Sequence, residues 1–111
     1  ISDNSLDDYS NIILNVEPME ASKGSNCIIT DTWFSMGEKE DNKKRVLLDP
    51  YRVDSNKISM ASSHSIFLHC LPAHRGEEVD NDVIDGSQSV VWDEAENRIH
   101  AQKGIISWCF K

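Results

Sequence analysis

The sequence predicts an α/β fold in which helices flank a parallel β-sheet. Short apolar runs rich in β-branched residues alternate with polar, helix-favouring stretches along the chain. Two of these runs lead directly into side chains that carry chemistry, at Asp31–Gly37 and at His69–Gly76. Ligands of open parallel sheets bind beyond the carboxyl ends of the strands, so we expect a site where these two segments meet. The 111 residues are enough for one small domain.

The composition argues against several classes of function. Hydrophobic residues make up 39% of the chain and charged residues 27%, as in a folded globular protein rather than a disordered one. The 19 acidic residues outnumber the 11 basic ones and give a formal charge of -8, which argues against nucleic acid or an anionic membrane as a partner. No run of about 18 apolar residues is present, so we expect no membrane-spanning helix. No secretory signal is visible. The chain begins with isoleucine rather than methionine, so we expect the native N-terminus to be missing, and any targeting segment with it.

The three cysteines, Cys27, Cys70 and Cys109, indicate neither a disulfide framework nor a zinc site. Their number is odd and no Cys-x-x-Cys pair occurs, so we expect free thiols in a reducing compartment. Histidines gather around Cys70 between positions 64 and 74, but no second half-site with zinc-ligand spacing follows. We therefore expect no bound metal.

The first part of the chain predicts a strand, a helix and a second strand. Ile12–Leu14 is a short run of β-branched and apolar residues, typical of a buried strand. Pro18 suits the first turn of a helix, and Gly24 suits its end. Asn26–Thr32 is predicted as the next strand, so these elements would form a right-handed, parallel βαβ unit.

The middle of the chain predicts two helices. Glu38–Leu48 consists mostly of charged, helix-favouring residues, and Pro50 would end that helix. Asp54 or Ser55 can cap a second helix that continues to Ala61, because such side chains accept hydrogen bonds from the free backbone N–H groups of a first turn.

The last part predicts two strands and two helices. Ile66–His69 is predicted as the third strand, followed by a short helix over Asn81–Asp85 that Gly86 ends. Ser89–Trp92 is predicted as the fourth strand. Asp93 is a candidate N-cap for a long final helix, whose acidic first turn complements the helix dipole. That helix is apolar on two faces, which is typical of packing on both sides, and in isolation one face would be bare.

Asp31–Gly37 places a carboxylate, a hydroxyl and a glycine at the end of a predicted strand. Asp31 could pair with the ammonium group of a ligand, while Ser35 and the backbone near Gly37 could donate hydrogen bonds to a carboxylate. Such partners would suit the α-groups of an amino acid. The alternative is a capping box at the start of a helix, with Glu38 three residues after Ser35. The two interpretations are compatible.

His69–Pro72 (His-Cys-Leu-Pro) ends the third predicted strand with an imidazole, a thiol and a proline. A lone cysteine such as Cys70 is most often a buried structural thiol, whereas a positively charged His69 beside it would favour a nucleophilic thiolate. A cysteine-protease arrangement would need separate histidine and asparagine partners, which the pattern does not show. Pro72 breaks strand pairing because it lacks an N–H.

Glu94–Arg98 forms the start of the final predicted helix. Its simplest interpretation is a solvated first turn with charge pairs four residues apart. The alternative is an arginine that points inward, since Arg98 lies on the same helical face as Ala101 and Ile105. A guanidinium group stays charged and donates to several oxygens at once, which suits a phosphate.

Together, these segments resemble those of ornithine carbamoyltransferases. His69–Pro72, with Ala73–Val79 after it, is similar to the His-Cys-Leu-Pro signature of that family. Asp31–Gly37 resembles its Asp-x-x-x-Ser-Met-Gly loop, and Ala95–Arg98 resembles its Ala-Glu-Asn-Arg segment. The order of the segments also agrees, from about Ile12 onward.

The resemblance implies a Rossmann-like α/β domain, the second domain of a carbamoyltransferase. Residues 1–111 would then form part of the ornithine-binding domain. Members of the family bind carbamoyl phosphate mainly through an N-terminal domain with Ser-x-Arg-Thr-Arg and His-Pro-x-Gln motifs, and neither motif occurs in these residues. We therefore expect the carbamoyl-phosphate domain to be absent from this chain.

The resemblance also implies which residues bind L-ornithine. Asp31 would hold its amine, and Ser35 with Met36 would contact its α-carboxylate and α-amino end. Cys70 would contact the side-chain end near the δ-amine, without forming a covalent intermediate. Trp33–Phe34 occupies positions that the family lets vary, so we expect these two aromatic residues to have packing roles.

Two residues are implied to contact carbamoyl phosphate. The backbone of Leu71 would accept a hydrogen bond from the carbamoyl amino group, and the bond from Leu71 to Pro72 would be cis, as in the family. Arg98 would reach the phosphate. Cys70 and Arg98 are therefore the expected catalytic residues, and the resemblance implies no metal and no cofactor.

The implied reaction is transfer of the carbamoyl group of carbamoyl phosphate to the δ-amine of L-ornithine, which gives citrulline and phosphate. It would serve arginine metabolism, in the cytoplasm of a bacterium or the mitochondrial matrix of an animal, and the complete enzyme would be a homotrimer. This chain alone would be inactive, since half of the site is missing. The alternative is a truncated paralogue that binds an amino acid or a partner subunit without catalysis. A relative acting on another diamine or on acetylated ornithine is disfavoured by Ser35-Met36-Gly37.

Overall fold

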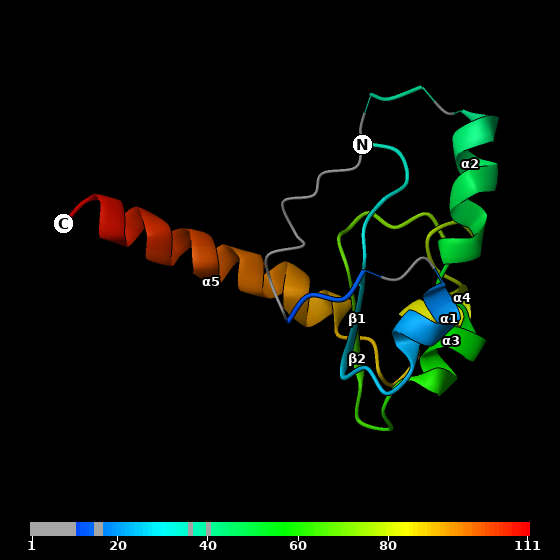
Figure 1. Cartoon of the computed structure of the whole chain (residues 1–111). Helices are drawn as coiled ribbons and strands as arrows, with labels where there is room; N and C mark the ends of the chain where they lie inside the picture. Colours follow the sequence, from blue (N-terminus) through cyan, green and yellow to red (C-terminus); the bar gives the residue numbers. More distant parts are fainter. Residues whose placement is uncertain (1–10, 15–16, 36, 40) are drawn as a thin grey trace.

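The centre of the molecule is a sheet of two parallel strands, β1 (Cys27–Thr30) and β2 (Ile66–His69). The computed structural model describes residues 11–14, 17–35, 37–39 and 41–111. The strands pair in register along their whole length, and their apolar, β-branched and aromatic side chains suit a pleated surface. Because the strands are parallel, their carboxyl ends meet at the same edge of the sheet, as Figure 1 shows.

Helices surround these strands: α1 (Pro18–Ser22), α2 (Asn42–Leu48), α3 (Ser55–Met60), α4 (Asn81–Ile84) and α5 (Val91–Cys109), with a 3₁₀ turn, η2, at Asp49–Tyr51. The cap at Asp54 is confirmed, since its Oδ1 accepts from the N–H of Lys57 over 2.9 Å. α2 begins later than predicted because Asp41, rather than Ser35, is its N-cap. α2 ends at Leu48, as predicted, and Pro50 lies in the 3₁₀ turn that follows it.

Two of the four predicted strands form, and they are β1 and β2. Ile12–Leu14 is not a strand, and Ile13 is 88% exposed. A short apolar run forms a strand only where a neighbouring strand pairs with its backbone and another element covers its side chains. The predicted βαβ unit is therefore wrong. The parallel connection from β1 to β2 runs instead through α2, η2 and α3.

The predicted strand Ser89–Trp92 is reduced to one bridge between Ser89 and Phe67. Two backbone hydrogen bonds of 2.8 and 3.0 Å join Phe67 to this segment. The chain then turns directly into α5, whose first residue is Val91. The prediction of Asp93 as the N-cap is wrong for the same reason, because Asp93 already lies in the first turn, where its charge suits the helix dipole.

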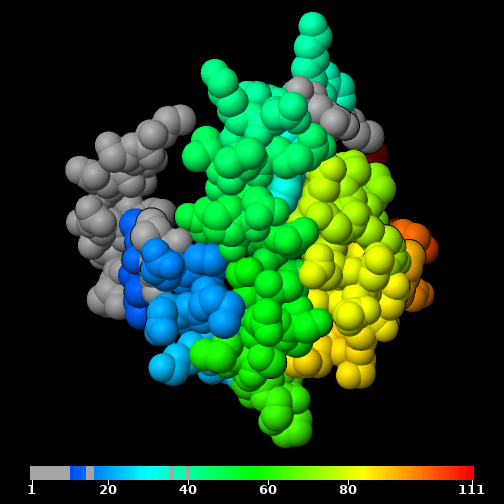
Figure 2. Space-filling view, turned by 90° about the vertical axis from the view of Figure 1, so that its right-hand side faces the viewer, coloured from blue at the N-terminus to red at the C-terminus, as the bar shows by residue number. Residues whose placement is uncertain are grey.

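The helices lie on two sides of the sheet. α1, α3 and α4 lie on one side, to the right of the strands in Figure 1, and Figure 2 looks onto this side, with α1 in blue, α3 in green and α4 within the yellow segment. α5 starts against β2 on the other side and then extends away from the sheet, so Trp108 and Phe110 are exposed. In the outer half of α5, therefore, neither of the two apolar faces is covered by another element of the described structure. Among the described residues, no helix is both long enough and apolar enough to cross a lipid bilayer.

The hydrophobic core forms where β2 meets the surrounding segments. Phe67, in the middle of β2, is fully buried. Other core side chains surround it: Val53, Val79, Val83, Ile84 and Val91, with Ile28, Ile58 and Ala73 packed against them. Burying one side chain of this size contributes about 1.5–3 kcal/mol. The core thus holds β2 in place and fixes where the segment after it begins.

Phe67→Ala should lower the free energy of unfolding by about 3–5 kcal/mol, because it removes a buried ring and leaves a cavity. Urea denaturation followed by circular dichroism measures the change. Ile29→Ala is the matched control in β1, where Ile29 is 68% exposed, and there the expected loss is below about 1 kcal/mol. Equal losses for the two substitutions would show that the core lies elsewhere.

Candidate active site

Asp31 and Cys70 meet at the carboxyl ends of the two parallel strands. They are the residues that follow the last strand pair, Thr30 with His69. The Sγ of Cys70 donates to the Oδ1 of Asp31 over 3.0 Å, and the backbone N–H of Thr32 donates to the same oxygen over 2.7 Å. The structure thus brings together two predicted site residues that are 39 positions apart in the sequence.

This pair holds a carboxylate and a neutral thiol. Burial, and then the hydrogen bond to Asp31, raise the pKa of the Cys70 thiol. The hydrogen bonds from Cys70 and from the backbone of Thr32 lower the pKa of Asp31. The shared proton therefore stays on sulfur at neutral pH. This favours a hydrogen-bonding role for Cys70 over the nucleophilic thiolate that the sequence left open.

His69 is a buried structural imidazole beside this pair. Its side chain is 1% exposed, its ring stacks on Phe67 with centroids 6.4 Å apart, and its Nδ1 lies 2.6 Å from the Oγ1 of Thr30. Its backbone N–H donates to the Oε2 of Glu94 over 3.0 Å, which connects the end of β2 to the first turn of α5. Burial lowers the pKa of His69 despite nearby carboxylates. A neutral imidazole supplies no positive charge to favour a thiolate on Cys70.

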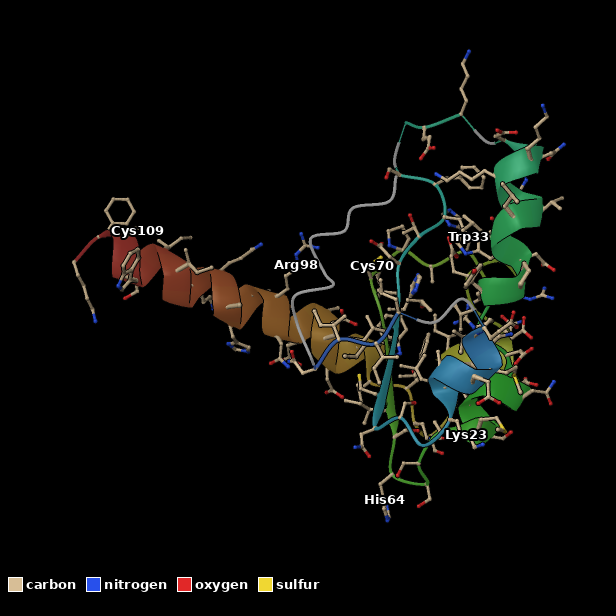
Figure 3. All side chains as sticks on the ribbon, viewed as in Figure 1. Lys23, Trp33, His64, Cys70, Arg98 and Cys109 are labelled. Atoms are coloured by element: carbon tan, nitrogen blue, oxygen red, sulfur yellow. The ribbon has the colours of Figure 1, made fainter. Side chains whose placement is uncertain are left out.

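Leu71 and Arg98 border a small cavity next to Cys70. Its volume is about 120 Å³, and its walls come from the end of β2 and the start of α5: His69, Cys70, Leu71, Glu94, Ala95 and Arg98. Figure 3 shows Cys70 at the end of the sheet and Arg98 on the nearby part of α5. The structure therefore places Cys70, Leu71 and Arg98 around one space. The cis bond from Leu71 to Pro72 is confirmed.

The Asp31–Gly37 loop forms a turn instead of starting a helix. The N–H of Ser35 donates to the Oε2 of Glu38 over 3.1 Å, and the N–H of Glu38 donates to the carbonyl of Ser35 over 2.9 Å. Because α2 begins only further along the chain, the capping-box interpretation is wrong as a helix start. Gly37 has a φ of 85°, a left-handed conformation that favours glycine. Met36, predicted to contact ornithine, lies outside the described residues.

A larger cavity, of about 240 Å³, lies between this loop and the segment after β2. Both segments line it: Thr32, Phe34, Ser35, Gly37, Glu38, Pro72, His74 and Glu77. Ser35 borders this larger cavity and Cys70 the smaller one, so the bend from Leu71 to Pro72 lies between the two spaces. Trp33–Phe34 packs at the base of the loop, with each side chain 8% exposed, which confirms the predicted packing roles.

Glu78 connects the two site segments, and sequence reasoning missed it. It is fully buried, and it accepts hydrogen bonds from the N–H of Trp33 (3.1 Å), the N–H of His74 (2.9 Å) and the Nδ1 of His74 (2.8 Å). Desolvation raises the pKa of Glu78, but these hydrogen bonds outweigh it and leave the pKa lowered. No local pattern distinguishes Glu78 from the partly exposed Glu77, so only the three-dimensional structure identifies this contact.

Metal ligands are not assembled in the part of the chain that the structure describes. No group of three or more His, Cys, Asp or Glu side chains lies close enough there to hold an ion. Figure 3 shows His64 at the opposite end of the strands from Cys70, so this histidine cannot join a site around the thiol.

These features define an open α/β domain with polar residues gathered at the carboxyl ends of parallel strands, the class of protein that binds ligands at this edge. A family model described as "Aspartate/ornithine carbamoyltransferase, Asp/Orn binding domain" matches residues 2–109. The chain therefore belongs to the aspartate/ornithine carbamoyltransferase family.

Individual relatives agree with the family assignment. An ornithine carbamoyltransferase from Rhodopseudomonas palustris (strain BisA53) is 56% identical over 101 residues, which cover 91% of this chain and 32% of that protein. One from Bradyrhizobium diazoefficiens is 57% identical over 99 residues, which cover 89% of this chain and 32% of that protein. The chain thus spans about a third of the length of these curated relatives.

Solved structures of similar proteins confirm the Rossmann-like α/β fold. An ornithine carbamoyltransferase from Pyrococcus furiosus matches with a TM-score of 0.75 and 49% identity, over 82% of this chain and 29% of that one. An anabolic ornithine carbamoyltransferase from Campylobacter jejuni matches with a TM-score of 0.77 and 36% identity, over 86% of this chain and 31% of that one.

Cys70 should be alkylated slowly by iodoacetamide near neutral pH, because its hydrogen bond to Asp31 and its burial keep the thiol protonated. Asp31→Asn removes the negative charge, so the alkylation rate of Cys70 should rise by about threefold or more. Peptide mass spectrometry measures the rate, with the exposed Cys109 as internal reference. Slower alkylation of Cys70 in the Asp31→Asn variant would contradict the assigned protonation.

Glu78→Gln should destabilise the domain by about 1–3 kcal/mol at neutral pH, because it replaces one oxygen of a buried carboxylate that accepts three hydrogen bonds with an NH₂ group, which cannot accept one. The pKa of Glu78 is lower in the folded state than in the unfolded chain. Its stabilising contribution is therefore complete above the unfolded pKa of about 4.3 and is lost as pH falls through the folded value.

The pH profile tests the sign of this effect. Urea denaturation at a series of pH values from about 7 to about 3 should show a shallower loss of stability on acidification for Glu78→Gln than for the wild type. Glu20→Gln, at an exposed carboxyl of α1, is the control. Parallel profiles for the wild type and Glu78→Gln would contradict a lowered pKa at Glu78.

Proposed function

We propose that this chain is the ornithine-binding part of an ornithine carbamoyltransferase. The complete enzyme transfers the carbamoyl group of carbamoyl phosphate to the δ-amine of L-ornithine and releases citrulline and phosphate. The observation that carries the proposal is the contact of Asp31 with Cys70, beside a cavity that Leu71 and Arg98 border. The names of the relatives, ornithine carbamoyltransferases from several bacteria, support the choice of ornithine.

The carboxylate and thiol suit the recognition of an amine. In the proposed complex, Asp31 holds an amine of ornithine through a charge-assisted hydrogen bond. Cys70 contacts the δ-amine end as a neutral thiol. The hydroxyl of Ser35, with Met36 after it, contacts the α-carboxylate and α-amino end. The free electron pair of the δ-amine attacks the carbamoyl carbon, the bond from that carbon to the phosphate oxygen breaks, and the departing phosphate takes up the proton that the amine loses.

Arg98 and Leu71 serve the other substrate in this proposal. The guanidinium of Arg98 donates to the phosphate oxygens and stabilises the negative charge that grows as phosphate leaves. The carbonyl of Leu71 accepts a hydrogen bond from the carbamoyl amino group and so orients the carbamoyl carbon. Most of the catalytic effect then comes from positioning and charge, and the proposed mechanism needs neither a covalent enzyme intermediate nor a metal or cofactor.

The proposal extends to the complete enzyme. A carbamoyl-phosphate domain would supply the remainder of the phosphate site, and three such subunits would form a homotrimer. The reaction would belong to arginine metabolism, in the cytoplasm of a bacterium or in the mitochondrial matrix of an animal. The alternative, a paralogue that binds an amino acid or a partner subunit without catalysis, is tested by the coding DNA upstream of Ile1. An in-frame carbamoyl-phosphate domain would support the enzyme, and a stop codon followed by a start codon near Ile1 would support the paralogue.

Substitutions in the complete enzyme should affect kcat/KM for the two substrates differently. Asp31→Asn should lower kcat/KM for ornithine by about 100-fold or more, since it removes the charge that holds the amine. Arg98→Met should instead act mainly on carbamoyl phosphate, with a loss in kcat/KM of the same order. A colorimetric citrulline assay measures both effects, and Cys27→Ala, at an exposed cysteine outside the site, is the control. Absence of citrulline formation by the wild-type enzyme would refute the proposed function.

A further inference from the structure

The helix α2 contacts both site segments through side chains that the proposed chemistry does not use. Phe34, in the Asp31–Gly37 loop, is 8% exposed although it lies in a loop. The Nζ of Lys44 lies 5.0 Å from the centroid of its ring, and the Cζ of Arg45 lies 5.4 Å from the same centroid. Both distances allow a cation–π interaction, so α2 holds the loop through the Phe34 ring.

Arg45 also reaches the other site segment. Its Nη2 donates to the Oε1 of Glu77 over 2.8 Å, and the two side chains are 32% and 28% exposed. Glu77 lies in the segment after β2 and borders the larger cavity, as Phe34 does. Arg45 therefore bridges the two walls of that cavity. We call Phe34, Arg45 and Glu77 together the Arg45 bridge.

Lys44 differs from Arg45 in this respect. Its ion pair, of 2.8 Å, is with Glu38, which follows the Asp31–Gly37 loop and accepts the N–H of Ser35. The contacts of Lys44 with Phe34 and Glu38 thus lie on the loop side of the cavity, whereas those of Arg45 with Phe34 and Glu77 cross it. Partly exposed ion pairs contribute little to global stability. Loss of the Arg45 bridge should therefore change the spacing of the two walls more than the folding of the domain.

We propose that Arg45 is a positioning residue for the amino-acid substrate, because it sets the spacing between the Ser35 wall and the Cys70 segment. The inference rests on the proposed function, in which ornithine spans these two segments, with its α-groups at Ser35 and its δ-amine at Cys70. A substrate of fixed length needs its two anchoring points at a fixed separation, and a small misplacement of one point lowers the rate strongly. Arg45 does not touch the reacting atoms; it acts through Phe34 and Glu77.

Kinetics of the complete enzyme test this role. Arg45→Met and Glu77→Gln should each raise KM for ornithine by about tenfold, with kcat and KM for carbamoyl phosphate within about twofold of the wild type. The double variant should be no worse than the single variants, since both break the same contact. Arg45→Lys keeps the positive charge and should restore part of the loss. Arg75→Met is the matched control, because Arg75 pairs with Asp85 over 2.6 and 2.8 Å and neither residue borders the larger cavity.

A second measurement does not depend on catalysis. In the complete enzyme labelled with 5-fluorotryptophan, the ¹⁹F resonance of Trp33, assigned by Trp33→Phe, should shift or broaden in Arg45→Met and Glu77→Gln but not in Arg75→Met. An unchanged Trp33 resonance together with an unchanged KM for ornithine would overturn the inference while leaving the proposed function intact. An enzyme that forms no citrulline from ornithine would refute the proposed function, and the ¹⁹F spectra would still decide whether Arg45 positions the loop.

Discussion

The parallel, in-register pairing of β1 with β2 is the constraint on which the site depends. Asp31 and Cys70 each follow the last residue of a strand, so parallel pairing delivers them to the same edge, side by side. Antiparallel pairing would separate them by the length of the sheet, and a shift of one residue would turn the side chains to opposite faces. The 3.0 Å contact between thiol and carboxylate is thus a consequence of strand direction and register.

Buried polar groups then fix the segments around this edge. Glu78 and His69 are both almost completely buried, and a buried polar group is costly unless it has partners. Glu78 finds its partners in Trp33 and His74, one from each site segment, and the backbone at His69 finds Glu94 at the start of α5. Because moving any of these segments would leave a buried group unsatisfied, the polar interior specifies one arrangement of the site.

Sequence reasoning succeeded where a feature depends on near neighbours. Asp54 caps α3 through a residue three positions away, and Asp31 and Cys70 are recognisable as polar side chains directly after apolar strands. It failed at Ile12–Leu14, whose composition matches that of β1 but whose side chains are exposed, because a strand needs a partner that a short run does not specify. It also missed Glu78, since its hydrogen-bond partner Trp33 is 45 positions away.

The negative charge of Asp31 and the positive charge of Arg98 are not paired with each other, and this bears on the chemistry that the site can support. The carboxylate of Asp31 bonds to Cys70, which borders the small cavity, and the guanidinium of Arg98 borders the same cavity from α5. Among the described residues no ion pair joins Asp31 to Arg98, so each charge stays available to a ligand of opposite sign. The carboxylate of Asp31 is already held by two hydrogen bonds, so it needs little reorganisation during a reaction. For the proposed transfer, an ammonium-bearing substrate would lie at Asp31 and a phosphate at Arg98, and the atoms that react would lie between them, next to Cys70 and Leu71.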